Sequence, residues 1–392
     1  MAATKSMHVV VIGAGAFGGW TAFQLVRRGV RVTLVDSWGA GHTRASSGGE
    51  TRVIRSVYGP DRIYSEMVKT SFERWADLDR MTEEALYVET GTLWFHRGDD
   101  AYVRASVPIL RELGFPIEQI APREARRRYP QVSFDGVKSI WLERKAGALS
   151  ARRACIALRD VFEKAGGTYR VAHAEPGQIT KNSMRAVRLA DGSRIEADAF
   201  VFACGPWLGR LFPDVVGEGV RPTRQEVYYF GLPRGSTRYA PDALPVWIDF
   251  GERIFYGVPD INGRGFKVAD DTRGEAFDPT GGSRTPTEEG IARVRKLLGE
   301  RFPELAAAPL VSAEVCQYEN SPDGHLIIDR HPQAKNVWIA GGGSGHGFKL
   351  APAVGTMLVD ALLEAKAPPP LFNIARLRDA KKPSTQFETK RS

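Results

Sequence analysis

HVVVIGAGAFGGWTAFQLVRRGVRVTLVD, residues 8–36, decides the fold class of this chain. An apolar run, a glycine turn, an amphipathic stretch and a second apolar run predict strand, turn, helix and strand. Gly13 permits a tight turn, Gly15 lets a pyrophosphate approach the backbone, and Gly18 lets the helix pack closely on the strand. Asp36 ends the second strand, where an acid can accept hydrogen bonds from a ribose. The stretch therefore predicts a dinucleotide site, without separating NAD from FAD.

The rest of the sequence places βα units at both ends of the chain around a strand-rich middle. Helical spacing of apolar residues predicts helices, and alternation between turn residues predicts strands. The expected elements are helices at 62–80, 122–130, 150–166 and 286–300, a strand at 88–97, a β-meander at 221–275, and strand–turn–helix units at 194–212 and 336–363. We therefore expect an α/β fold in which a Rossmann-like domain carries an inserted, antiparallel-β-rich domain.

These elements suggest where the two domains are divided. The nucleotide-binding domain is expected to comprise 1–82, 147–220 and 319–375, and the substrate domain 83–146 and 221–318. Residues 376–392 are polar and charged, which predicts a flexible tail.

Composition limits the class of protein. The 392 residues, 43% hydrophobic and 26% charged, suit a globular protein whose core needs no disulfide or structural metal. Three scattered cysteines are too few for a disulfide framework or a cysteine-rich metal site, which favours a reducing, cytoplasmic location. No apolar run of about 18 residues predicts a membrane span. The net charge of +8 is spread along the chain without a nucleic-acid-binding motif. We expect no metal, nucleic acid or membrane partner.

Further glycine-rich segments favour FAD over NAD. Residues 39–59 form a polar loop where an NAD-binding domain usually continues with plain βα units, and a flavoprotein uses such a loop to cover its cofactor. Residues 200–207 read as a strand and turn beside the bound nucleotide. Residues 338–355 place a second glycine loop before a helix, whose dipole would stabilise negative charge on a reduced flavin. The Rossmann-like domain is therefore expected to bind FAD.

Five motifs together resemble one family. They are GAGAFG (13–18), HTRASSGGETRVIR (42–55), GRGFK (263–267), EVCQY (314–318) and GGGSGHGFK (341–349). The chain resembles the D-amino-acid oxidase superfamily of FAD-dependent oxidoreductases, within the group of monomeric sarcosine oxidase and N-methyltryptophan oxidase. The motifs span nearly the whole chain in the expected order, so the match is specific.

The resemblance implies a set of cofactor contacts. They are Gly13, Gly15, Ala16, Phe17, Gly18, Asp36, Ser37, His42, Thr43, Arg44, Ser47, Thr51, Arg52, Cys316, Gly343, Gly345, Gly347, Phe348 and Lys349. In the family a cysteine two residues before a tyrosine carries FAD covalently, and Cys316 with Tyr318 matches it. A thiolate is also a suitable nucleophile toward an electrophilic flavin methyl group. By itself, a cysteine such as Cys316 is more often a buried apolar filler, with a catalytic thiol as another alternative, and filler is the interpretation of Cys155 and Cys204.

The resemblance also implies catalytic and substrate-binding residues. In the family a lysine near the flavin activates oxygen, and Lys267 matches it; Arg52 and Tyr318 are the other expected catalytic residues. An arginine and a lysine hold the substrate carboxylate in the family, and Arg55 and Lys349 match them, as two converging cations would. Tyr256 and Gly345 complete the expected substrate pocket.

Two positions depart from the family pattern. Asp271 stands where the sarcosine oxidases have a histidine, and it either recognises a second amine or turns outward. Trp247 replaces a smaller aliphatic residue, and it either selects a flat or bulky substrate or serves packing. Both are treated as substrate-pocket residues, and together they place sarcosine itself in doubt.

The predicted function is FAD-dependent oxidation of a secondary amine, an N-alkylated or cyclic amino acid, to an imine while O2 is reduced to H2O2. The expected partners are a small amine carrying a carboxylate and O2, and the expected state is a monomer. Three alternatives stay open: a flavin dehydrogenase passing electrons to another acceptor, a non-catalytic flavoprotein subunit, and a flavin domain that modifies tRNA. Lys267 favours an oxidase over a dehydrogenase.

Overall fold

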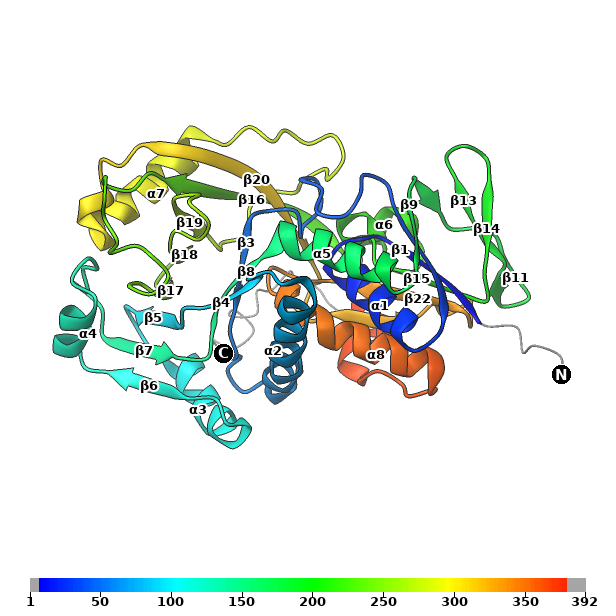
Figure 1. Ribbon diagram of the computed structural model, residues 1–392, viewed down its shortest axis with the longest axis horizontal. Coiled ribbons are helices and arrows are strands. Elements are labelled where there is room, and N and C mark those ends of the chain that lie inside the picture. The colour runs from blue at the N-terminus through cyan, green and yellow to red at the C-terminus, as the bar shows by residue number, and fades with distance from the viewer. Residues whose placement is uncertain (1–6, 379–392) are drawn as a thin grey trace.

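The computed structural model describes residues 7–378 (Figure 1). Two large sheets occupy opposite ends of the molecule, one of six strands and one of eight. Helices α1 and α8 lie against the six-stranded sheet, and α2 lies between the two ends (Figure 1). This arrangement agrees with the expected α/β fold, and one hydrophobic core joins residues of both sheets, among them Val9 and Trp94.

The six-stranded sheet has the doubly wound order expected of a Rossmann-like domain. Its strands, in spatial order, are β21 (Ile327–Arg330), β22 (Val337–Gly341), β15 (Ala199–Phe202), β1 (His8–Ile12), β2 (Arg31–Asp36) and β9 (Thr168–Val171). All pairs are parallel except β21 with β22. The carboxyl ends of β1, β15 and β22 therefore meet at one edge, where open α/β sheets bind ligands.

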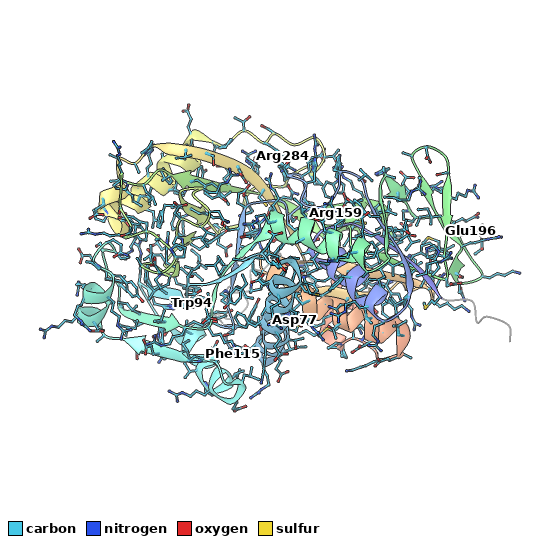
Figure 2. All side chains as sticks on the ribbon, in the orientation of Figure 1. Asp77, Trp94, Phe115, Arg159, Glu196 and Arg284 are labelled. Carbon is cyan, nitrogen blue, oxygen red and sulfur yellow. The ribbon has the colours of Figure 1, made fainter. Side chains whose placement is uncertain are left out.

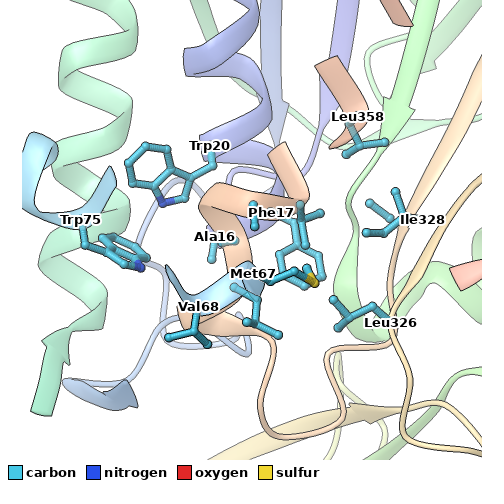
Figure 3. Close-up of a cluster of buried hydrophobic side chains, with 14 of the residues drawn as sticks. Ala16, Phe17, Trp20, Met67, Val68, Trp75, Leu326, Ile328 and Leu358 are labelled. Atoms are coloured by element: carbon cyan, nitrogen blue, oxygen red, sulfur yellow. The ribbon is translucent and has the colours of Figure 1, made fainter. Parts of the chain in front are cut away.

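Alternation along β1 shows how this sheet is covered on both faces. Val9 and Val11 join a core with the helices, whereas Val10 and Ile12 join a core beneath a small antiparallel sheet. The helices are α1 (Ala16–Arg27), α2 (Arg62–Thr82), α5 (Ala151–Lys164) and α8 (Ala351–Leu363), and the small sheet comprises β10 (Ala174–Glu175), β13 (Ala186–Leu189) and β14 (Arg194–Glu196). Figure 3 shows Trp20 of α1 facing Trp75 of α2, with their ring centroids 5.1 Å apart.

The eight-stranded sheet forms the other end of the molecule. Its order is β20 (Leu310–Asn320), β16 (Arg221–Phe230), β19 (Phe266–Asp270), β18 (Ile254–Val258), β17 (Val246–Phe250), β5 (Thr92–His96), β7 (Ser139–Glu143) and β6 (Ile117–Ile120). It is antiparallel except that β17 and β5 run parallel, so the predicted antiparallel character holds for all but one pair. Helices α3 (Ala101–Leu113), α4 (Pro122–Arg128) and α7 (Glu288–Arg301) accompany it. The sequence interpretation did not include α3.

A three-stranded sheet lies between the two ends of the molecule. It consists of β3 (Thr51–Ile54), β8 (Gly147–Ser150) and β4 (Tyr87–Glu89), all antiparallel. β3 carries Arg52 and is followed directly by Arg55, so the central sheet positions both arginines expected in the active site. The domain division proposed above stays a prediction.

Trp247 corrects one expectation about the substrate pocket. Its side chain is fully buried in the core of the eight-stranded sheet. Its ring stacks near Phe95 and Phe266, at centroid distances of 6.4 and 6.1 Å, and meets Phe302 at 4.9 Å. Trp247 lines neither of the cavities described below. The packing alternative is therefore the one that the structure supports, because an aromatic cluster already surrounds the ring.

The predicted flexible tail begins too early. Arg376 lies in a 3₁₀ helix, Ile374–Arg378, and its guanidinium donates to the Asp323 carboxylate at 2.7 Å. The remainder of the predicted tail, 379–392, lies outside the described residues.

Within residues 7–378, no helix is long and apolar enough to cross a membrane. The same part of the chain contains no group of three or more His, Cys, Asp or Glu side chains placed to hold a metal ion.

Candidate active site

A cavity of about 470 Å³ lies at the carboxyl ends of β1, β15 and β22. Its volume is in the range of small-molecule and cofactor sites. Thirteen of the expected cofactor contacts line it: Gly13, Gly15, Ala16, Phe17, Asp36, Ser37, His42, Ser47, Arg52, Gly343, Gly345, Gly347 and Phe348. The structure thus brings the first glycine loop, the polar loop and the second glycine loop around one space.

Six expected contacts lie outside this cavity. They are Gly18, Thr43, Arg44, Thr51, Cys316 and Lys349. A Cβ on Gly18 would meet the Gly13 carbonyl oxygen at 1.8 Å, so this glycine serves close packing of helix on turn. Thr43 is exposed, and Thr51 is buried as an acceptor for Lys267. Cys316 and Lys349 line a second cavity.

The first glycine loop is shaped to admit a ligand. Gly13 has φ +103°, and a Cβ there would meet the Ala203 carbonyl oxygen at 2.3 Å, so only glycine fits. The Asp36 carboxylate accepts hydrogen bonds from the backbone N–H groups of Ala14, at 2.7 Å, and Gly39, at 2.9 Å. It therefore fixes the loop while still lining the cavity. These residues fit a dinucleotide, whose phosphates favour free N–H groups at the start of α1.

A segment between β19 and α7 lies along one end of the cavity. Thr280 accepts hydrogen bonds from Trp207 Nε1, at 2.8 Å, and, through its carbonyl, from Arg44. Arg284, labelled above β20 in Figure 2, donates to the carbonyl of Val315 at 2.8 Å and to Gln317 Oε1 at 2.9 Å. A segment that leaves the eight-stranded sheet thus borders a cavity built on the six-stranded one. We call residues 272–287 the bridging segment.

A second cavity, of about 70 Å³, adjoins the first. Arg52, Tyr318, Gly345 and Phe348 line both. The smaller cavity is also lined by the expected substrate residues Arg55, Tyr256, Asp271 and Lys349, and by Cys316. Its position and charged lining suit a small polar substrate held beside a cofactor.

Two buried cations that line the smaller cavity lie near the same aromatic ring. Arg55 and Lys349 are 3% and 4% exposed. The Arg55 guanidinium lies 4.7 Å from the centroid of Tyr58, and Lys349 Nζ lies 5.3 Å from the same centroid. Burial, and then the neighbouring Arg55, hold the pKa of Lys349 well below its usual value. A carboxylate entering the cavity would relieve this repulsion. Nothing in the sequence pattern pointed to Tyr58.

Asp271 faces the same cavity, so the outward alternative is wrong. Tyr318 donates its hydroxyl hydrogen to Asp271 Oδ1 at 2.7 Å. Burial raises the pKa of Asp271 to about 6, and the Tyr318 hydrogen bond and the charge of Arg55 oppose that rise. The cavity therefore presents the Asp271 carboxylate together with the cations Arg55 and Lys349, and Arg52, Glu226 and Asp270 also line it.

Lys267 lies behind this lining rather than in it. It is 1% exposed, and its Nζ donates to the Thr51 carbonyl at 2.9 Å and lies 5.5 Å from the Tyr256 centroid. Burial, and then the charge of Arg52, lower the pKa of Lys267 to about 7. Its neighbours Tyr256 and Arg52 do line the smaller cavity, so a cation at Lys267 acts on the site at short range.

The three cysteines differ in their surroundings. Arg52 Nη2 donates to Cys316 Sγ at 3.4 Å, and Cys316 is half-buried at the smaller cavity. Burial raises the pKa of the Cys155 thiol to about 11 and that of the Cys204 thiol further. Burial without enough compensating positive charge disfavours a thiolate, and the charge of Arg52 only partly opposes this effect at Cys155. Among the three, Cys316 lines the smaller cavity and contacts a guanidinium, whereas Cys204 lines the larger cavity.

Glu143 is a further buried residue that the sequence did not reveal. Its Oε1 accepts hydrogen bonds from the hydroxyl of Ser56, at 2.6 Å, and from the backbone N–H of Ser56. Since Ser56 follows Arg55 directly, Glu143 of β7 fixes the backbone that presents this arginine. The link requires a contact between distant segments, which no local motif encodes.

A family model described as FAD dependent oxidoreductase matches residues 8–361. The chain belongs to this family. The resemblance drawn from the five motifs is therefore confirmed. FAD is the cofactor of this family, and the larger cavity is the candidate site for it. Residues in the cavity fit it: two glycine loops and the N-terminus of α1 line a space with room for a cofactor.

Relatives of this FAD-dependent oxidoreductase match nearly its whole length. A monomeric sarcosine oxidase of Arthrobacter sp. (strain TE1826) is 31% identical over 93% of this chain and 95% of its own. The human peroxisomal sarcosine oxidase is 28% identical, covering 98% of both chains. The structure of an L-proline dehydrogenase from P. horikoshii superposes with a TM-score of 0.84 at 22% identity, over 96% of this chain and 99% of the other. The last match confirms the expected fold class.

Proposed function

We propose that this chain is an FAD-dependent amine oxidase whose substrate is a secondary amine of an amino acid, N-alkylated or cyclic. The observation that carries the proposal is the smaller cavity, where Arg55 and Lys349 stand with the Asp271 carboxylate beside the cofactor cavity. An amino acid offers the complementary groups, a carboxylate and an N–H. The relatives named sarcosine oxidase support the same class. The predicted cytoplasmic location and monomeric state remain part of the proposal.

Different residues of the smaller cavity would bind the two polar ends of the substrate. Arg55 and Lys349 would hold the carboxylate, and Asp271 would accept a hydrogen bond from the nitrogen. Binding both ends fixes the carbon next to nitrogen toward the shared wall of the two cavities, which converts binding into orientation. When bound, FAD supplies a two-electron acceptor: the substrate loses two electrons and two protons to give an imine, and O2 takes up both to give H2O2.

Lys267 supports the choice of oxygen as the acceptor. A buried cation stabilises the negative charge that develops as oxygen is reduced, because water is excluded there. A dehydrogenase that passes electrons to another acceptor would not need this cation.

A panel of N-methyl, cyclic and primary amino acids tests the proposal. We expect anaerobic addition of the right compound to bleach the yellow flavin, and air to restore the colour with one H2O2 formed per substrate. No bleaching by any secondary amino acid would contradict the substrate class. Bleaching followed by slow reoxidation would instead favour the dehydrogenase.

Covalent attachment of FAD through Cys316 is a separate prediction. We expect acid-denatured wild-type protein to retain its yellow colour in the pellet, because the Arg52-paired thiol would have formed a thioether with the flavin methyl carbon. In that step the thiol and the methyl group would each lose a hydrogen, the flavin ring would take up the two electrons, and O2 would then accept them to give H2O2. Cys316→Ala should release all of its flavin, whereas the control Cys155→Ala should retain it. Free flavin in the supernatant of the wild-type protein would return Cys316 to the role of an unmodified thiol.

Asp271 predicts a pH dependence of substrate capture. Its pKa of about 6 means that the carboxylate is ionised above pH 6 and protonated below, so kcat/KM should fall as pH drops through 6. Asp271→Asn should lose this acid limb and lower kcat/KM by about 10- to 100-fold, the range of a hydrogen bond to a charged group. An unchanged limb in the variant would assign it to another residue. Steady-state peroxide assays from pH 5 to 9 measure both.

A further inference from the structure

Glu319 is a buried acid that the function proposed above does not use. It is the penultimate residue of β20, is 8% exposed, and lines the larger cavity. Its carboxyl group lies between two turns: a Cβ on Gly205 would meet Oε2 at 3.5 Å, and a Cβ on Gly343 would meet Oε1 at 2.9 Å. Two glycines therefore leave the space in which this carboxyl group stands.

The polar groups of Glu319 are incompletely satisfied. Its backbone carbonyl accepts a hydrogen bond from the Ser344 N–H at 3.1 Å, which ties β20 to the second glycine loop. Its side-chain Oε2 is buried, and no group among the described residues bonds to it. Burial raises the pKa of Glu319 to about 7, against the influence of the Gly343 and Gly342 backbone amides. A buried oxygen without a partner is costly, so a partner within the cavity is expected.

The place of Glu319 along the cavity shows which part of a dinucleotide it meets. Gly13, at the phosphate end, packs against Ala203, and the turn continues to Gly205 beside Glu319. In the other direction, the next residue is Tyr318, which lines both cavities and whose ring lies 2.7 Å from a Cβ built on Gly345. Glu319 thus stands between the fingerprint loop and the wall shared with the substrate cavity.

The portion of FAD between its phosphates and its ring is a chain of hydroxyl groups. A phosphate would repel a carboxylate, and a flavin ring presents a different set of polar atoms, whereas a hydroxyl both donates and accepts. We propose that the Glu319 carboxyl group hydrogen bonds to a hydroxyl of the sugar-alcohol chain of FAD, and so helps to set how deeply the flavin is held. This inference rests on FAD binding, not on the identity of the substrate.

Equilibrium binding of FAD tests the assignment. The assay uses apoprotein carrying Cys316→Ala, so that covalent attachment does not interfere, and follows quenching of flavin fluorescence. Glu319→Ala should weaken FAD binding by about 10- to 100-fold, because a buried hydrogen-bond partner is lost. Glu319→Gln keeps a donor and an acceptor and should stay within about threefold of the parent.

Deoxy analogues of FAD, each lacking one hydroxyl of the sugar-alcohol chain, identify the partner. One analogue should bind the parent protein more weakly than FAD does. The same analogue should bind the parent and Glu319→Ala with equal affinity, since the interaction is then absent from both complexes. Glu314→Ala is the matched control, because Glu314 lies on the same strand and lines neither cavity. We expect it to bind FAD like the parent.

Two results would overturn the assignment. The first is a loss in Glu319→Ala that is the same for FAD and for every analogue, or no loss at all. The second is unweakened binding of all the analogues to the parent protein, a result that does not depend on whether any Glu319 variant folds. Neither result bears on the amine oxidase proposal, because substrate is absent from the assay.

Discussion

Replacing Lys267 by methionine should slow reoxidation of the reduced enzyme by air about 100- to 1000-fold, the usual cost of removing one preorganised charge-stabilising group. Methionine keeps the length of the side chain and removes the charge. Anaerobic reduction by substrate should change by less than about threefold, because Lys267 lines neither cavity. Stopped-flow spectroscopy separates the two half-reactions. Equal losses in both would refute the assigned role.

The charge of Lys267 gives the oxygen reaction a pH signature. With a pKa of about 7, the side chain is cationic below pH 7 and neutral above it, so wild-type reoxidation should slow as pH rises through 7. Lys267→Met should show no such step. Lys138→Met, which changes an exposed lysine, serves as the control and should keep the wild-type profile.

Replacing Arg55 by alanine should raise KM for an amino-acid substrate by about 100-fold or more, with a smaller fall in kcat, because a buried cation that pairs with a carboxylate contributes mainly to binding. Steady-state kinetics with peroxide detection measures both constants. Lys349→Ala should act in the same direction, since the two cations share the Tyr58 ring.

A substrate without a carboxylate provides the internal control. Wild type and Arg55→Ala should oxidise the corresponding uncharged secondary amine at similar kcat/KM, because that substrate brings no carboxylate for Arg55 to bind. A variant that loses kcat alone, or loses as much on the uncharged amine, would show that Arg55 supports the active site in another way. Thermal unfolding of both proteins controls for damage to the buried site.

Local patterns in the sequence predicted the parts of the site that depend on backbone shape. The spacing of Gly13, Gly15 and Gly18 predicts a turn before a helix, and the structure places that turn at the larger cavity. Gly13 has a positive φ and Gly18 leaves no room for a Cβ, so both requirements leave signatures in a single segment.

Side-chain directions across segments were harder to predict. Trp247 is packed among Phe95, Phe266 and Phe302, a cluster drawn from three separate segments. Asp271 turns inward because Tyr318, on another strand, donates to it. Such outcomes follow from tertiary contacts, which hydrophobic periodicity does not contain.

The bridging segment, residues 272–287, connects cofactor binding to the stability of the fold. Thr280, in the segment that follows the eight-stranded sheet strand β19, accepts hydrogen bonds from Trp207 and Arg44. Both of these residues follow strands of the six-stranded sheet. A molecule occupying the larger cavity touches both sides of this junction. Because a ligand stabilises the arrangement that binds it, we expect bound FAD to stabilise the contact between the bridging segment and the six-stranded sheet. The flavin is thus expected to stabilise the fold as well as to take part in the reaction.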